Sequence, residues 1–304
     1  MMCLAEVLRF LDSSSYLRNL LALKGGTAIN LLFFDLPRMS VDIDLDFCVN
    51  VNRSDMFDER EKVQDQLLRH MTASGYTLSS KSKMYHSLRS YIFDYVNAGG
   101  AKDHLKIEIN YSLRSHILPM SRMVLSSNIV GGGFEVNCVA PIEIYATKTV
   151  ALLTRGAARD LYDMNYLVKS NMFSISDLEM YRKCVIFYLA VSTENPITNI
   201  QYSSIDEITL RRIKTDLRPV MRDRDVFELD AAKVSVKEFL DNALFMKECD
   251  VAFLNRFSNK EYCPELLFDD QEILARIRNH PMALWKCSES EIVKSQEIRV
   301  KKVG

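Results

Sequence analysis

Three aspartates alternate with apolar residues near the start of the chain. Asp42, Asp44 and Asp46 are separated by single residues in the segment VDIDLDFCV. In a β-strand, residues two apart point to the same face, so the three carboxylates would line one side of a strand. Aspartate is depleted in strands, and neighbouring carboxylates repel one another unless a cation lies among them. Paired carboxylates suit Mg²⁺, although a solvated face of a two-sided strand would give the same pattern.

A second polar strand face follows in the segment LKIEIN. Lys106, Glu108 and Asn110 alternate with apolar residues, so they share one face of a predicted strand. If this strand lies beside the first, Glu108 can complete a two-metal cluster of the kind that performs phosphoryl transfer. The alternative is an exposed strand face that carries lysine and glutamate.

A glycine turn precedes the aspartates. Gly25 and Gly26 lie between a short apolar strand and an apolar helix that begins near Thr27. Glycine lets the backbone approach a phosphate closely, and free N–H groups at the start of a helix favour anions. A Gly-Gly pair alone indicates only a turn. Followed by Ser40 and Asp42, it predicts a phosphate-binding turn next to a metal-binding strand.

A lysine interrupts an apolar helix later in the chain. Between Ile142 and Leu153 the only charged residues are Glu143 and Lys148, and Lys148 shares a helix face with apolar residues. A partly buried lysine needs an anionic partner. Lys148 is either a lysine at the rim of the core that extends its amine to solvent, or a point charge for the triphosphate of a nucleotide.

Two aspartates follow on the next predicted helix. Asp160 and Asp163 are three residues apart, and Arg159 precedes Asp163 by four, so all three can share one helix face. A surface ion pair is the ordinary explanation of such a pattern.

The elements that position these residues fall into two parts. Apolar residues at helical spacing predict a helix at the N-terminus and another over residues 55–74. From Pro141 the pattern is almost wholly helical, with segment 194–204 as the best candidate for a loop. Segregated strands and helices indicate an α+β fold, with domains over 1–140 and 141–304. The strands predicted from alternation or apolar runs occupy residues 41–49, 85–96, 104–112 and 131–140.

Composition places the chain among ordinary globular proteins. Of 304 residues, 48% are hydrophobic and 26% charged, and 39 Lys and Arg nearly balance 40 Asp and Glu. No overall charge therefore indicates nucleic acid or a membrane. The seven cysteines are dispersed without a C-x-x-C pair, which favours reduced thiols over zinc or disulfides. With no signal-peptide pattern and no apolar run of about eighteen residues, we expect a cytoplasmic protein.

Two local basic segments could bind the phosphates of a nucleic acid. Residues 81–130 contain seven Lys and Arg against three acidic residues, interleaved with tyrosines, and residues 209–224 contain six against two. Such segments suit phosphates, and aromatic rings can stack on single-stranded ends. Charged segments are nevertheless more often solvated faces.

The glycine turn and the aspartates together resemble a known superfamily. GGTAINLLFFDLPRMSVDIDLDF is similar to the signature of DNA polymerase β-type nucleotidyltransferases, G-G/S followed by D-x-D. Arg38 and Ser40 just before Asp42 resemble the abortive-infection AbiEii group, to which the mycobacterial MenT toxins belong. KIEINYSLR and EIYATKTVALLTRGAARDLYDMNYLV extend the resemblance over about residues 20–170. Thr27 stands where many members have serine, and it keeps a hydroxyl for phosphate.

The resemblance implies a polymerase β-like nucleotidyltransferase fold, a mixed sheet with helices followed by a mostly helical C-terminal domain that completes the active site. It implies Mg²⁺ or Mn²⁺ as cofactor, bound by Asp42, Asp44 and Glu108, with Asp163, or alternatively Asp160, as a further functional aspartate. The implied catalytic residues are Asp42, Asp44, Lys148 and Asp163. The implied nucleotide-binding residues are Gly25, Gly26, Thr27, Arg38, Ser40 and Lys148.

The reaction expected from these residues starts from an NTP. A substrate hydroxyl attacks the α-phosphate and pyrophosphate leaves, with positioning and charge neutralisation providing most of the catalysis. The resemblance implies a bacterial toxin of a type IV toxin–antitoxin pair, with an antitoxin partner and an RNA acceptor. The tRNA 3′ end is the expected acceptor, and its modification would block translation and growth. Two alternatives are nucleotidylation of a protein hydroxyl and a non-catalytic nucleotide-binding module.

Overall fold

The structure, a computed structural model, describes residues 2–34, 36–40, 42–125, 133–193 and 200–288 of the chain. The chain divides into two compact units. The first comprises Met1–Ala140 and Val220–Asp225, and the second comprises Pro141–Pro219 and Val226–Gly304.

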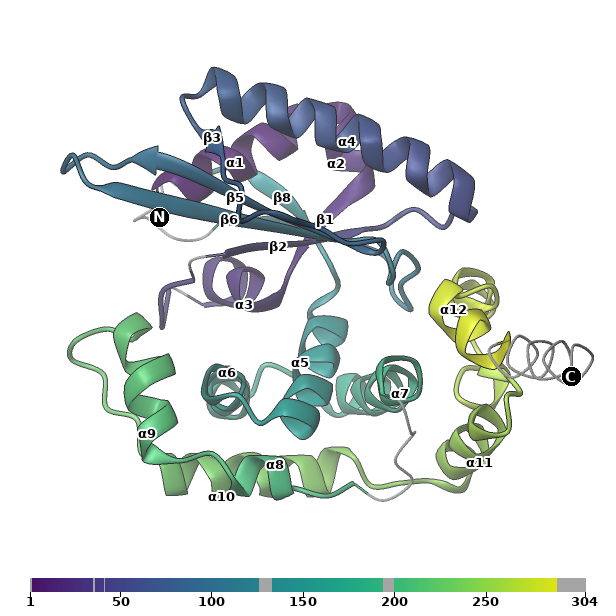
Figure 1. Cartoon of the computed structure of the whole chain (residues 1–304). Helices are drawn as coiled ribbons and strands as arrows, with labels where there is room; N and C mark the ends of the chain where they lie inside the picture. Colours follow the sequence, from purple (N-terminus) through teal and green to yellow (C-terminus); the bar gives the residue numbers. More distant parts are fainter. Residues whose placement is uncertain (1, 35, 41, 126–132, 194–199, 289–304) are drawn as a thin grey trace, which may run out of the picture. The chain divides into compact units, whose positions relative to one another are not determined.

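A mixed β-sheet forms the centre of the first unit (Figure 1). The strand order is β3-β5-β6-β2-β1-β8-β7, with β4 paired to β5. Strand β2 runs parallel to β6 and antiparallel to β1, while β1 runs parallel to β8. The strands are β1 (Leu21–Lys24), β2 (Asp42–Phe47), β3 (Thr77–Leu78), β4 (Lys83–Met84), β5 (Leu88–Val96), β6 (Lys102–Asn110), β7 (Ser121–Val124) and β8 (Glu135–Cys138).

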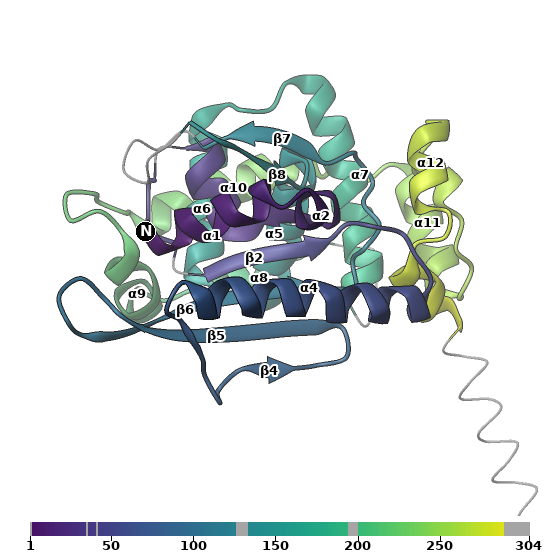
Figure 2. The ribbon, with the colours of Figure 1, turned by 90° about the horizontal axis from the view of Figure 1, so that it is seen from above.

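Alternation in β2 gives the sheet two different faces. Ile43, Leu45 and Phe47 are buried, and Leu45 lines the same small cavity as Leu8 and Leu11 of α1 (Met2–Ser13). Helices α1, α2 (Ser15–Leu20) and α4 (Arg53–Ala73) lie over this apolar face (Figures 1 and 2). The aspartates of β2 therefore point to the opposite face, on the side of the short helix α3 (Gly25–Ala28).

A distant segment completes the first unit. The amide of Met39 donates to the carbonyl of Val220 at 2.7 Å, and Arg38 forms an isolated bridge with Met221. Arg222 Nε also donates to the carbonyl of Leu36 at 2.9 Å. These contacts are why residues 220–225 belong to the first unit although the flanking sequence belongs to the second.

Helices form the second unit, and the C-terminal half of α7 (Ile175–Ser192) is buried. Residues 184–191 of α7 are all buried, as expected of a helix that is apolar on every side. α7 contacts α5, α10 and α11, and α6 packs against α5 and α10. The other elements are α5 (Pro141–Arg155), α6 (Ala158–Ser170), α8 (Ser203–Asp206), α9 (Leu210–Arg212), η3 (Ile213–Leu217), η4 (Arg218–Val220), α10 (Leu229–Ala243), α11 (Glu248–Ser258), η5 (Pro264–Leu266) and α12 (Gln271–Ile277).

The α+β fold class is confirmed, as are the strands expected from alternation. Strands β3, β4 and β7 were not predicted, because segments of two to four residues are too short to establish a period. After α3, the helix expected from Thr27 onward continues as one π-helical turn, η1 (Ile29–Phe33). Residues 131–132 of the last predicted strand and 194–199 of the predicted loop lie outside the described residues. No helix in the described ranges is both long and apolar enough to cross a membrane.

Candidate active site

The glycine turn between β1 and α3 lies against Asp44. Gly25 has a φ of +68°, a left-handed conformation that glycine adopts without strain. A Cβ atom at this position would lie 2.5 Å from Asp44 Oδ2. Only glycine therefore allows the backbone to approach the carboxylate this closely.

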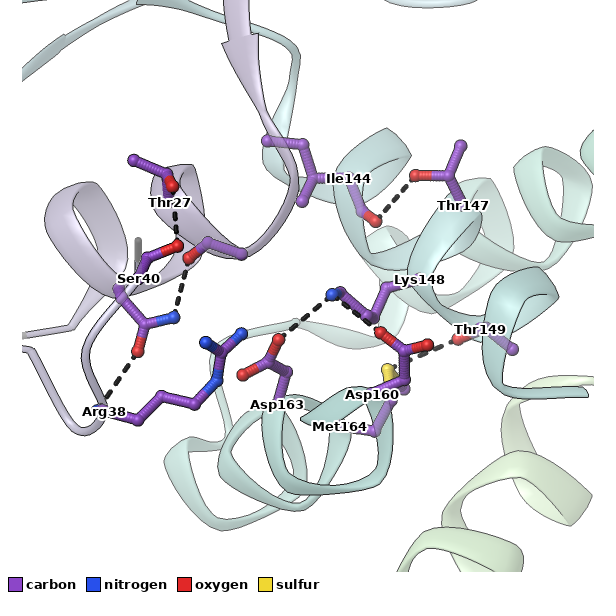
Figure 3. A network of polar contacts seen from close by, with 12 residues as sticks. Thr27, Arg38, Ser40, Ile144, Thr147, Lys148, Thr149, Asp160, Asp163 and Met164 are labelled. Atoms are coloured by element: carbon purple, nitrogen blue, oxygen red, sulfur yellow. Dashed lines mark hydrogen bonds and ion pairs between the residues drawn. The ribbon is translucent and has the colours of Figure 1, made fainter. Parts of the chain in front are cut away.

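Hydrogen bonds connect the segment after the glycine turn to the start of β2. Thr27 Oγ1 donates to the carbonyl of Asp42 and lies 2.7 Å from Ser40 Oγ (Figure 3). Because the single hydroxyl hydrogen of Thr27 is used on that carbonyl, Ser40 is the donor between the two hydroxyls. Thr27 is fully buried and Ser40 is largely buried. This part of the expected nucleotide site is thus a buried, hydrogen-bonded unit.

Arg38 and Gly26 are also brought together. A Cβ at Gly26 would lie 2.6 Å from Arg38 Nη2. Asn30 connects the two residues, since its Nδ2 donates to the carbonyl of Gly26 at 2.6 Å and its Oδ1 accepts from the amide of Arg38 at 3.3 Å. Sequence analysis did not select Asn30, although a polar residue four positions after Gly26 in an otherwise apolar helix was an available signal.

The carboxylates of β2 and β6 share a face because the two strands are neighbours. Asp44 is paired in register with Glu108, and Asp42 with Lys106. Lys106 Nζ lies 3.0 Å from Glu108 Oε1 and 3.9 Å from Asp42 Oδ2. Partial burial lowers the pKa of Lys106, but the hydrogen bond that it donates to Glu108 and the charge of Asp42 outweigh burial and raise the pKa above its usual value.

The third aspartate of the β2 series has a different environment. The Asp46 side chain is 3% exposed, and Lys24 Nζ lies 2.5 Å from its Oδ1. His116 Nε2 lies 3.7 Å from the other oxygen. Lys24 itself is paired in register with Asp44 across β1 and β2. The alternation of aspartates could not distinguish Asp46, which is neutralised by a lysine, from the two that precede it.

The donor set fits a divalent ion that prefers oxygen ligands. Among the described residues, no three His, Cys, Asp or Glu side chains are grouped so as to hold a metal ion. Mg²⁺, however, is commonly bound by only one or two carboxylates together with water and substrate phosphates. Asp42 and Asp44 supply two such carboxylates on one strand face, and the close approach of Gly25 fixes one of them.

In the second unit, Lys148 of α5 lies between two aspartates of α6. Its Nζ is 2.9 Å from Asp160 Oδ1 and 3.1 Å from Asp163 Oδ2 (Figure 3). The side chains of Lys148, Asp160 and Asp163 are 10%, 2% and 1% exposed, respectively. The interpretation of these aspartates as members of a surface ion pair is therefore wrong, because both are buried. Arg159 instead donates to the backbone carbonyl of Asp216 at 2.8 Å.

Asp160 is shared by two cations. Arg155 Nε donates to Asp160 Oδ2 at 2.8 Å while Lys148 contacts Oδ1. Burial raises the pKa of Asp160, but the charge of Lys148 and the hydrogen bond from Arg155 outweigh it and lower the pKa below its ordinary value. Asp160 is therefore ionised at neutral pH and holds both cations.

A family model described as "Nucleotidyl transferase AbiEii toxin, Type IV TA system" matches residues 9–242, and the chain belongs to this family. Among solved structures it is similar to MenT4, a nucleotidyltransferase toxin from Mycobacterium tuberculosis H37Rv. The identity is 16%, the match covers 93% of this chain and 91% of that chain, and the TM-score is 0.60. No curated protein matches the chain.

Family membership establishes the general activity. The chain is a nucleotidyltransferase toxin of the type IV toxin–antitoxin class, for which an NTP is the substrate and an antitoxin the partner. Enzymes of this kind generally use a divalent metal ion. The likeness to MenT4 concerns the fold.

Proposed function

We propose that the chain transfers a nucleoside monophosphate from an NTP to a hydroxyl of RNA, with Mg²⁺ as the metal ion and the 3′ end of tRNA as the acceptor. The observation that carries the proposal is the approach of the Gly25 backbone to Asp44. It brings a phosphate-binding turn and a metal-binding carboxylate together in the same few residues. This is the combination that phosphoryl transfer requires.

In this proposal Asp42 and Asp44 bind the ion, and Glu108 is the third carboxylate on the same face. The ion supplies charge neutralisation on the phosphates. Gly25 and Gly26 bring the backbone at the start of α3 close to Asp44 and Arg38. The phosphates would bind there, beside the hydrogen-bonded hydroxyls of Thr27 and Ser40.

Lys148 supplies a further positive charge for the triphosphate. Its amine is held by Asp160 and Asp163, so its position is fixed before substrate arrives. A positioned charge contributes more to catalysis than one that must be ordered during the reaction. Asp163 is the proposed catalytic aspartate of this group, and Asp160 holds the lysine in place.

The RNA acceptor is inferred from the resemblance to the toxin family, and local charge supports it. Arg211, Arg212 and Lys214 are exposed on α9 and η3, which supports contact with a phosphate backbone. Modified tRNA ends would not accept amino acids, so growth would stop until the antitoxin acts. These substrates place the proposed activity in the bacterial cytoplasm.

The test is a labelling assay. Purified chain is incubated with each α-labelled NTP in turn, Mg²⁺ and total tRNA, and RNA and protein are separated on a denaturing gel. We expect label on RNA with the wild type and none with Asp44→Asn. The matched control is Asp94→Asn, an exposed aspartate of β5 on the same sheet face, which should label like the wild type.

Three results would contradict the proposal. Label on protein would show that the acceptor is a protein hydroxyl. Nucleotide binding without transfer to any acceptor would indicate a non-catalytic module. Equal labelling by a folded Asp44→Asn variant would exclude the proposed metal site.

A further inference from the structure

We infer that the Lys106 ammonium occupies the place of a second metal ion. The chain then binds a single divalent ion through Asp42 and Asp44, and Glu108 holds Lys106 instead of a metal. The inference rests on the proposed function and specifies the metal content of its site.

The position of Lys106 is set by strand pairing. It is the register partner of Asp42 in β6, and Glu108 follows two residues later on the same face. Its Nζ lies 3.0 Å from Glu108 and 3.9 Å from Asp42, so it lies within reach of both carboxylates. In two-metal sites the ions lie about 3.5–4 Å apart and share carboxylates. A second ion between Asp42 and Glu108 would need the space that this amine fills.

The residues around Lys106 favour this position of its ammonium group, between Glu108 and Asp42. The neighbouring strand β5 presents Ser90 opposite Glu108 and Ile92 opposite Lys106. Neither residue is charged, so the β5 residues directly opposite Lys106 and Glu108 offer no competing charge. The charged groups that act on Lys106 are Glu108, Asp42 and Asp44.

The lysines on this face also limit where a divalent ion can bind. Lys24 is 2.5 Å from Asp46 and Lys106 is 3.0 Å from Glu108. Asp42 and Asp44 lie beside them on the same strand face. A second cation between Asp42 and Glu108 would face the positive charge of Lys106.

The experiment counts ions directly. Purified chain is titrated with Mn²⁺ alone, and free Mn²⁺ is measured from its electron paramagnetic resonance signal. We expect one ion per chain for the wild type, none for Asp44→Asn, and two for Lys106→Met, in which Asp42 and Glu108 become available together. Lys102→Met, an exposed lysine on the same face of the same strand, is the matched control and should bind one ion.

Two further variants test whether the positive charge at position 106 and the carboxylate at position 108 affect ion binding. Lys106→Arg keeps the positive charge and should bind one ion. Glu108→Gln should also bind one, with an affinity within about 3-fold of the wild type. Circular dichroism checks that each variant is folded.

The inference is overturned if the wild type binds two ions or none, if folded Lys106→Met binds one, or if Glu108→Gln loses its ion. Its failure is distinct from failure of the proposed function. Two bound ions together with Asp44-dependent labelling of RNA would refute only the inference. Loss of labelling in all conditions would refute the function.

Discussion

Replacing Gly25 by alanine tests whether the site depends on close approach of the backbone to Asp44. The new Cβ would lie 2.5 Å from Asp44 Oδ2, and ordinary van der Waals contact begins at 3.4 Å. The carboxylate or the turn must therefore move by the difference, 3.4 − 2.5 = 0.9 Å. A misplacement of about 1 Å can reduce catalysis by about 10²-fold. We expect a loss of that size in the rate of label transfer to RNA.

The same variant also carries a backbone cost. Gly25 has a φ of +68°, and an L-residue in that region costs about 1–2 kcal/mol. At about 2–4 °C per kcal/mol for a domain of this size, the melting temperature should fall by about 2–8 °C. Strain alone could be mistaken for a defect of the site, so a control with equal strain is needed.

Gly75 provides that control. It follows α4 with a φ of +85°, and an added Cβ would meet nothing within 4 Å. Gly75→Ala should lower the melting temperature by a similar amount and leave transfer unchanged. If Gly25→Ala retains transfer within about 3-fold of Gly75→Ala, the argument from close approach is refuted.

Three other predictions follow from buried polar groups. Lys148→Met removes the cation between Asp160 and Asp163, so it should cost about 3 kcal/mol in urea unfolding and lower transfer by about 10²–10³-fold. Thr27→Val removes a buried hydroxyl that serves Ser40 and Asp42 and should cost about 1–3 kcal/mol, whereas Thr27→Ser should cost about 1 kcal/mol. The pKa of Asp160 is lowered, so its stabilisation is complete above its unfolded pKa and is lost as pH falls through the folded value. The stability difference between wild type and Asp160→Asn should therefore narrow below about pH 4.

Much of the sheet could be predicted because one physical rule governs it. Apolar and polar residues alternate through β2 and β6, and the apolar members are buried, together with Asp46. The pattern could not reveal which strands are neighbours, since pairing depends on contacts between distant segments. The attachment of residues 220–225 to the first unit has the same origin, because backbone hydrogen bonds such as Met39 to Val220 carry no sequence signal.

The lysines of the site were missed for a related reason. Lys24 and Lys106 each lie on a strand where alternation predicts only that the side chain faces the polar side of the sheet. Whether such a lysine is solvated or paired depends on the register of the neighbouring strand, which puts Lys106 opposite Asp42 and Lys24 opposite Asp44. A charged residue beside a carboxylate motif is therefore a reason to ask what lies across the strand pair.

The two aspartates of α6 show how a structure separates residues that spacing leaves equivalent. Three positions apart on one helix, both can reach the same lysine, and both do. Asp160 is also bound by Arg155, a largely exposed side chain from the last turn of α5, so the positive charge of Lys148 is not its sole compensation. When a phosphate attracts Lys148, Asp160 keeps Arg155 as a cationic partner. Asp160 is thus suited to holding the lysine throughout the proposed reaction, and the catalytic role of Asp163 stays a prediction.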